Sequence, residues 1–508
     1  MGESNLFEID EAERLIDLNR SWNFKHLALP CAAYALLFAF CMFKNWSGIL
    51  TPVWIGSLVF LVAYLTQKTG KQLKKGSAFM MTVMLIISVS CFCTANSMVL
   101  FSNYVAEFLL LMALVLHNYA DDSQWDLAKL FGEILRAVFG SIGKLSAPFT
   151  DGKAYFDGKP GDKKGKAGPI LVGILIAIPT CIALGLILAS ADAVFENIFV
   201  RFFEEIIRWE NIIGVCFMLA FGFLSAYCGM RQVQAEGPLI TVKEPKKTGP
   251  VTAITVTSVV TLLYLLFSVV QILFLFTGSF ELPKGISYAE YARRGFFQLL
   301  VVSVMNLAVV LILKKHIEKS KVLNAILLVI CFCTYIMIAS SAIRMIMYIQ
   351  AYNLTMYRIS VLFALLTLAV LLVGVIILVV KDDFSFRRFC VIAMSIIYIP
   401  FAFLNADAQI ARFNLKNNNV VKSADSSRRN YHYDFYYISS LSTDAAPAIR
   451  EYFAQYDDPE EKMLDTDWYI EYCLNNEIDG AFVGIRTFNI SRYRANTTLP
   501  IPKNGDLF

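Results

Sequence analysis

The stretch "ISVLFALLTLAVLLVGVIILVV", residues 359–380, runs for 22 residues without one charged side chain. About twenty apolar residues in an α-helix are enough to cross the hydrocarbon core of a bilayer. Similar runs recur along the 508-residue chain, which is 57% hydrophobic and only 17% charged. A soluble domain is nearer a quarter charged. The sequence therefore predicts an all-α fold, a polytopic helical membrane bundle.

Apolar runs and the breaks between them predict about eleven membrane spans. The predicted spans are Leu27–Phe43, Ile49–Thr66, Ala78–Phe101, Tyr104–Tyr119, Pro169–Ala189, Ile212–Gly229, Val251–Phe276, Gly295–Leu313, Val322–Tyr348, Ile359–Val380 and Phe389–Leu404. Lysine and arginine concentrate in alternate loops, at residues 68–75, 153–166, 231–247, 314–321 and 381–388. Short cytoplasmic loops are rich in these residues, so these loops and the N-terminus are predicted to lie inside. An odd number of spans then places the chain after Leu404 outside.

These spans divide the chain into five predicted regions. They are a cytoplasmic N-terminal segment (1–26), spans 1–4 (27–119), a cytoplasmic amphipathic helix with a flexible basic linker (120–168), spans 5–11 (169–404) and an extracytoplasmic tail (405–508). The tail is too polar to span. Its segment "STDAAPAIREYFAQY" starts with a capping residue and carries apolar residues at helical spacing. About a hundred residues bury a modest core, so we expect a small, mostly helical domain.

Charged residues gather in the loops predicted to lie outside, including the two arginines of "SYAEYARRGFFQL", residues 287–299. The candidate outer polar cluster comprises Asp192, Glu196, Glu290, Arg293, Arg294, Arg344 and Arg358. The favoured interpretation is that these are ordinary interfacial charges that pair locally or with lipid phosphates. The alternative is an outward-facing cavity for an anionic or zwitterionic ligand, such as a lipid headgroup.

Three polar residues are predicted within the membrane: Glu107, Gln271 and Asn306. A lone amide at mid-span usually forms an interhelical hydrogen bond, which we predict for Asn306. The place of Glu107 depends on the turn between the third and fourth spans. A turn at Asn96–Ser97 puts Glu107 near the midplane, as a proton-relay candidate with His117. A turn at Ser102–Asn103, which we favour, puts Glu107 in a first helical turn, where the helix dipole stabilises an acid.

Several phrases are similar to one family of bacterial membrane proteins. "LILASADAVFENIF", "SYAEYARRGFFQL", "SSAIRMIMYIQAYNLTMYR", "NADAQIARFNL" and "FNISRYRA" resemble the domain-of-unknown-function family 4173. The resemblance implies a bacterial cytoplasmic (cell) membrane and a polytopic helical fold with a soluble tail. It brings no established activity, catalytic residue or cofactor.

Some members of that family are labelled as carotene-cleaving oxygenases, whose iron site needs four converging histidines. The four histidines of this chain are His26, His117, His316 and His432. Three are predicted at cytoplasmic ends of spans and His432 in the outer tail, so they cannot share one metal. We predict no catalytic residue, no metal site and no cofactor, and reject this activity.

Three functions remain open. The first is a membrane scaffold or sensor, favoured by the polar outer face and the tail. A transporter or permease for a small anionic or zwitterionic solute or lipid ranks nearly equal with it. An enzyme acting on a lipid-linked substrate comes third. The expected partners are the lipid bilayer, with anionic lipid headgroups as candidate ligands, and protein partners that the sequence does not identify. The small net charge of +4 gives no nucleic-acid footprint.

Overall fold

The computed structural model describes residues 3–123, 125–157, 209–235, 247–276, 288–416, 430–479 and 484–501. Across these ranges the chain forms helices and no strand. Seven of these helices are long and apolar enough to cross a membrane, or eight if one bent pair counts as a single span. The predicted all-α, polytopic membrane bundle is therefore confirmed.

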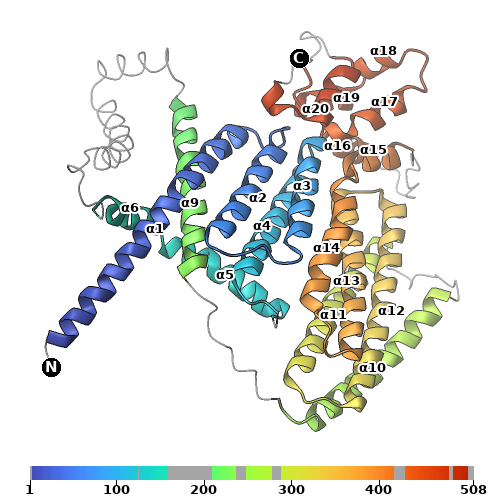
Figure 1. Cartoon of the computed structure of the whole chain (residues 1–508). Helices are drawn as coiled ribbons and strands as arrows, with labels where there is room; N and C mark the ends of the chain where they lie inside the picture. Colours follow the sequence, from blue (N-terminus) through green and yellow to red (C-terminus); the bar gives the residue numbers. More distant parts are fainter. Residues whose placement is uncertain are drawn as a thin grey trace, which may run out of the picture.

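The N-terminal half of the bundle is built around a group of long helices that pack on one another (Figure 1). They are α1 (Glu3–Met42), α2 (Thr51–Lys68), α3 (Ser77–Cys93), α4 (Ser97–Tyr119) and α9 (Trp209–Ala235). Leu27, Leu65 and Leu114 are buried in their shared core. The short helices α5 (Leu127–Gly143) and α6 (Ala147–Asp157) pack on this group, α5 mainly on α9 and α6 on α1.

The amphipathic helix predicted after the fourth span is α5. Asp126 caps its start by accepting a hydrogen bond of 2.8 Å from the Lys129 backbone N–H. Leu130 and Ile134 are buried against the bundle, whereas Phe139 on another face is 66% exposed. A helix with apolar residues on an outward face suits the membrane interface.

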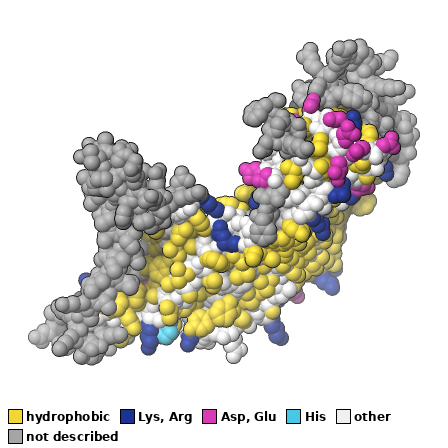
Figure 2. Space-filling model, turned by 90° about the horizontal axis from the view of Figure 1, so that it is seen from above, with side chains coloured by type: hydrophobic (Ala, Val, Ile, Leu, Met, Phe, Trp, Pro, Cys, Tyr) yellow, Lys and Arg dark blue, Asp and Glu magenta, His cyan; other side chains and the backbone are white. Residues whose placement is uncertain are grey.

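The second half of the bundle contains α10 (Val251–Phe276), α11 (Tyr288–His316), α12 (Lys321–Tyr352), α13 (Met356–Val380) and α14 (Phe386–Ala402). Leu327, Leu372 and Val375 are buried at its centre. Contacts between α14 and α3 join the two halves. Figure 2 shows a broad band of hydrophobic side chains, with Lys and Arg mainly at its borders and Asp and Glu gathered on the tail. This is the surface that a bilayer requires.

The tail is a set of short helices at one end of the bundle (Figure 1). They are α15 (Ala406–Lys416), α16 (Asn430–Ser439), α17 (Ala446–Phe453), α18 (Pro459–Leu464), α19 (Asp467–Asn475) and α20 (Ile490–Thr498). Their core includes the buried rings of Phe453, Tyr469 and Tyr472. We call this end of the bundle the tail end and the opposite end the far end.

The turn between α3 and α4 differs from the favoured prediction. α3 ends at Cys93 and α4 begins at Ser97, so the preferred turn at Ser102–Asn103 is wrong. The side chain of Asn96 accepts a hydrogen bond of 3.0 Å from the Val99 backbone N–H and caps α4. Glu107 therefore lies near the middle of α4, not in its first turn.

Four predicted spans differ from the described helices in their bounds or lie outside the described residues. Ile49–Thr66 corresponds to α2, and Ala78–Phe101 contains α3, a shorter apolar helix, and the start of α4. Phe389–Leu404 corresponds to α14, which is bent by 54° from α15. At the bend Asn405 has a φ of 50°, a left-handed conformation that asparagine tolerates. The predicted span Pro169–Ala189 lies outside the described residues.

Candidate functional site

Polar side chains are buried where the tail meets the bundle. We call the following residues the clasp: Asn45, Thr94 and Asn96 from bundle loops, and Asp407, Asp444, Arg486 and Asn489 from the tail. Six of the seven are buried, and Arg486 is half-buried. Because a buried polar group is costly without a hydrogen-bond partner, this contact is specific to one docking geometry.

Asn489 joins the tail to two loops at once. Its Nδ2 donates to the carbonyl oxygens of Ser47, at 2.8 Å, and Thr94, at 2.9 Å. Its Oδ1 accepts from the backbone N–H groups of Ser491, at 2.9 Å, and Arg492, at 3.2 Å, capping α20. Both donors and both acceptor positions of the amide are thus used.

Two tail carboxylates receive donors from the α3–α4 turn. Asp444 accepts hydrogen bonds from the Thr94 hydroxyl and, at 2.9 Å, from the Ala95 backbone N–H. Asp407 accepts from Asn96 Nδ2 at 2.8 Å, and also from the hydroxyl of Ser442 in the tail. The tail therefore provides hydrogen-bond acceptors for the polar groups of the turn that separates α3 from α4.

Arg486 binds the end of α1. Its Nη1 donates to the carbonyl oxygens of Phe43, at 2.6 Å, and Phe40, at 3.3 Å. A cation at this position complements the negative end of the helix dipole. In return, Asn45 Nδ2 donates to the Arg486 carbonyl oxygen at 3.1 Å. Apolar contacts continue the same junction, because Val99 of α4 belongs to the tail core.

A change in pH is expected to act on the clasp through Asp444. Burial raises the pKa of the Asp444 carboxyl, against the hydrogen bonds that it accepts. A carboxyl whose pKa is raised by folding contributes stability at low pH and loses it as pH rises through that pKa. Between about pH 4 and pH 7, Asp444→Asn should therefore gain thermal stability relative to the wild type as pH increases.

Melting curves across this pH range check the prediction. The Asn amide can still accept from Ala95 and donate to the Thr94 hydroxyl, so the variant should fold. The control is Asp457→Asn in an exposed part of the tail, which should melt with the pH profile of the wild type. Parallel profiles for wild type and Asp444→Asn would contradict the assignment.

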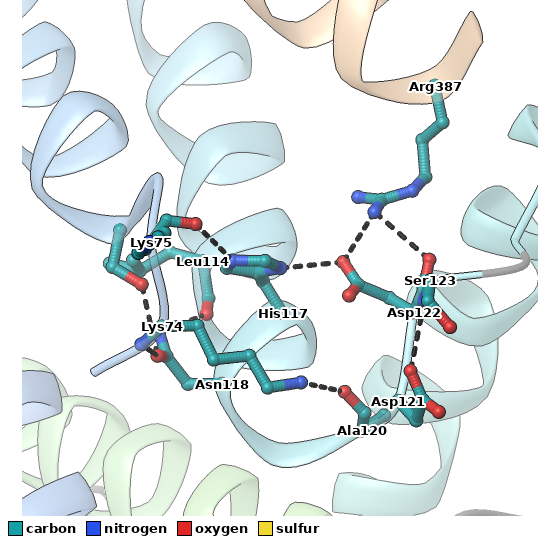
Figure 3. A network of polar contacts seen from close by, with 11 residues as sticks. Lys74, Lys75, Leu114, His117, Asn118, Ala120, Asp121, Asp122, Ser123 and Arg387 are labelled. Carbon is teal, nitrogen blue, oxygen red and sulfur yellow. Dashed lines mark hydrogen bonds and ion pairs between the residues drawn. The ribbon is translucent and has the colours of Figure 1, made fainter. Parts of the chain in front are cut away.

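A second polar network lies at the far end (Figure 3). His117 Nδ1 lies 2.7 Å from Asp122 Oδ2, and its Nε2 lies 3.0 Å from the Lys75 carbonyl oxygen. Arg387 Nη2 lies 2.7 Å from the same Asp122 oxygen. Burial alone would raise the pKa of Asp122, but His117 and Arg387 outweigh it and hold this pKa below its usual range. The imidazole of His117 thus lies between two acceptors, the Asp122 carboxylate and the Lys75 carbonyl oxygen.

The same network binds the α2–α3 loop to the end of α4. Lys74 Nζ donates to the Ala120 carbonyl oxygen at 2.6 Å, and the Lys74 backbone N–H donates to Asn118 Oδ1 at 3.0 Å. Ser77 Oγ donates to the same Asn118 oxygen at 3.0 Å. Three loops predicted to share one side of the membrane, near residues 74, 120 and 387, thus meet at one end.

Two predicted intramembrane amides form interhelical hydrogen bonds. Asn306 of α11 accepts from the Tyr264 hydroxyl at 2.8 Å and donates to Thr334 Oγ1 at 2.9 Å. The bond predicted for Asn306 is therefore confirmed, with partners on α10 and α12. Gln271 accepts from the hydroxyl of Ser340 at 2.6 Å and from Arg344 Nη2 at 3.3 Å.

The predicted outer polar cluster is only partly described. Arg358 donates to the carbonyl oxygens of Tyr352 and Asn353 and lies 4.3 Å from the centre of the Tyr348 ring, so it closes the end of α12. Arg344 instead packs against Gly295, where a Cβ would lie 2.1 Å from its Nη1. Asp192 and Glu196 lie outside the described residues. Glu290, Arg293 and Arg294 lie at the start of α11, and their side chains are also outside the described part. A shared outer cavity stays a prediction.

A model for a domain of unknown function (DUF4153) matches residues 79–452. The chain belongs to this family. The DUF4153 match includes the α3–α4 turn together with Asp407 and Asp444, and it ends before Arg486 and Asn489. Family 4173, which the sequence phrases resemble, is not the family whose model matches. No curated protein and no solved structure matches the chain.

Several residues of these networks were missed from sequence. Asp122 and Arg387 are separated by 265 positions, and Asp407 lies 311 positions from Asn96. No local spacing connects such pairs. The phrases "NADAQIARFNL" and "FNISRYRA" do contain Asp407 and Asn489, so their unusual polarity was the available signal. Among the described residues, no group of three or more His, Cys, Asp or Glu side chains could hold a metal ion.

Proposed function

We propose that the protein is a membrane scaffold or sensor, in which the bundle presents a docked tail outside a bacterial cell membrane. The clasp carries this proposal. A tail that were only tethered would not need hydrogen bonds from Asn489 to two separate loops. Buried polar groups that are all hydrogen-bonded hold the tail in one geometry. A scaffold would then present a defined surface to a partner, and a sensor would have a contact that a signal can break.

Charge supports the proposed orientation. The Lys74–Lys75 loop and Arg387 meet at the far end, opposite the tail. Two other loops predicted to be cytoplasmic, at residues 314–321 and 381–388, also contact each other. There Lys314 and Lys319 pair with Asp382 at 2.7 and 2.9 Å. Short loops rich in Lys and Arg stay in the cytoplasm, so the tail end faces outward.

We propose an anionic lipid headgroup as the ligand class of such a sensor. We also propose that the chain is related to family 4173, on the sequence phrases that it shares with that family. Arg293 and Arg294 directly precede Gly295, against which Arg344 packs, so three arginines lie near the same end of the bundle. Arginine binds phosphate oxygens in a bidentate geometry. No observation favours transport or catalysis to the same degree.

A tail-releasing variant tests the proposal. In Gly48→Ala the new Cβ would lie 2.7 Å from the Arg486 backbone oxygen and 2.2 Å from Asn45 Oδ1, so the clasp must shift. Gly56→Ala is the matched control, because its Cβ would meet only Leu85, at 3.8 Å. We expect limited proteolysis to cleave the tail several-fold faster in Gly48→Ala and at the wild-type rate in Gly56→Ala.

The same pair of variants can show whether the docked tail recruits proteins. A photo-reactive residue in place of Leu474, which is 54% exposed on α19, is activated in native membranes. Defined protein adducts are expected from the wild type and from Gly56→Ala, with several-fold fewer from Gly48→Ala. Adducts with lipid alone, or equal protein adducts from all three, would overturn the scaffold proposal.

A further inference from the structure

Glu107 is a buried carboxyl group with no partner in the middle of α4. It is 4% exposed, and neither of its oxygens has a hydrogen-bond partner. No ion pair in the described part of the chain includes it. This differs from the buried carboxylates of Asp407 and Asp444, each of which accepts several hydrogen bonds, and from that of Asp122, which contacts both His117 and Arg387.

The polar groups nearest to Glu107 in the helices are bonded to one another. Asn103, one turn away on the same face of α4, donates to Ser90 Oγ of α3 at 2.8 Å. Its Oδ1 accepts from the Tyr398 hydroxyl of α14, also at 2.8 Å. On the other side of Glu107, Leu110 and Leu114 belong to the apolar core. Asn103 and its partners therefore lie on the tail-end side of Glu107, and apolar core residues lie on the other side.

Within the described residues, no ion pair places a cation against the Glu107 carboxylate. The titratable side chains that face it are the thiol of Cys91 on α3 and the hydroxyls of Tyr104 on α4 and Tyr398 on α14. The cations of the other helices packed on α4 are placed elsewhere. Lys68 ends α2 near Tyr64, Lys129 of α5 lies over Trp125, Arg136 pairs with Glu133, and Arg231 of α9 pairs with Asp151.

The charge state follows from these surroundings. Burying an ionised carboxylate without a partner is strongly unfavourable compared with leaving it in water, whereas the neutral acid has no net charge to desolvate. We propose that Glu107 is a proton-binding site, which holds a proton while α3, α4 and α14 are packed together. Release of the proton requires water to reach the carboxylate, so protonation favours the packed arrangement of these helices.

Exchange with water is expected from the tail end. Asn103 lies about 6 Å from Glu107 along the helix axis, and Asn96 of the clasp lies about 16 Å away, at 1.5 Å per residue. Toward the far end, three turns of helix separate Glu107 from His117, and Leu114 between them is fully buried. The exchange path is therefore expected on the tail-end side of Glu107, through the polar groups at Asn103 and Asn96, and not by a direct relay to His117.

Dicyclohexylcarbodiimide tests this proposal on the full-length protein in detergent. This apolar reagent adds to a protonated carboxyl: the carboxyl oxygen bonds to the central carbon and its proton moves to a nitrogen. The adduct keeps every atom of the reagent, so its mass identifies the residue after digestion. We expect labelling of Glu107 that falls by at least tenfold between acidic and strongly alkaline pH, and none at this position in Glu107→Gln.

Two further arms decide between proton and cation. Sodium or potassium chloride should leave the labelling unchanged relative to choline chloride, whereas protection by one of these salts would overturn the proton in favour of a metal-cation site. A water-soluble carbodiimide with an amine should label exposed acids such as Asp457 and spare Glu107. Absence of labelling by the apolar reagent at every pH, in protein that still melts cooperatively, would also overturn the proposal.

Discussion

Asn489→Asp is expected to detach the tail while leaving α20 capped. The carboxylate keeps the acceptor oxygen that binds the backbone N–H groups of Ser491 and Arg492. It has no donor for the carbonyl oxygens of Ser47 and Thr94, and it turns a negative charge toward both. Each buried carbonyl left without a donor costs about 1–3 kcal/mol, so docking should weaken by roughly 3–6 kcal/mol once the repulsion is added.

Proteolytic release of the tail and the melting temperature of the detergent-solubilised protein measure this effect. Asn475→Ala is the control, because its amide bonds only to Ser439 inside the tail. Asn475→Ala should slightly lower the stability of the tail itself, and the tail should stay docked on the bundle. Equal proteolysis of Asn489→Asp and the wild type would mean that the clasp hydrogen bonds are not what holds the tail.

Asp122→Ala is expected to be among the most destabilising single changes at the far end. Asp122 is 4% exposed and is the carboxylate partner of both Arg387 and His117. Removing it leaves the Arg387 guanidinium, which cannot lose its proton, buried without a carboxylate. Breaking a buried ion pair from one side costs about 3–5 kcal/mol.

The neighbouring acid supplies the control. Asp121 is exposed and accepts a hydrogen bond only from the Ser123 backbone N–H, so Asp121→Ala should lie within about 1 kcal/mol of the wild type. Thermal unfolding in detergent compares the two variants. The double variant Asp122→Asn with Arg387→Gln removes both charges and should recover part of the loss. Equal melting temperatures for Asp121→Ala and Asp122→Ala would contradict the network in Figure 3.

The helices were predictable because their signal is local and repeated. Apolar runs such as 359–380 identify a span without any reference to the rest of the chain. The interhelical bond of Asn306 was equally predictable, because an amide at mid-span has few alternatives. The α3–α4 turn was mistaken because Asn96 and Ser102–Asn103 both offer capping residues. What favours Asn96 is tertiary: Asp407 and Asp444 bind that turn from more than 300 positions away.

The polar networks could not be predicted for the same reason. Charge patterns along the sequence predict a polar cluster in the outer loops. Two of its members, Arg344 and Arg358, bind separate partners in the structure. Glu107 was recognised as a candidate, but its significance depended on the turn. Its lack of a partner is a property of packing between α3, α4 and α14, which no periodicity reveals.

One helix connects all of these places. α14 carries Arg387 at the far end and Tyr398 beside Asn103, and through the bend at Asn405 it continues into α15 with Asp407 of the clasp. The three contacts therefore lie along one continuous path of backbone, which includes the 54° bend between α14 and α15. We expect a small shift of α14 along its axis to strain all three contacts. Loosening one contact should therefore lower the free energy needed to break the other two. Because coupling between two sites is reciprocal, we expect loosening of the clasp to weaken the Asp122–Arg387 contact at the far end as well.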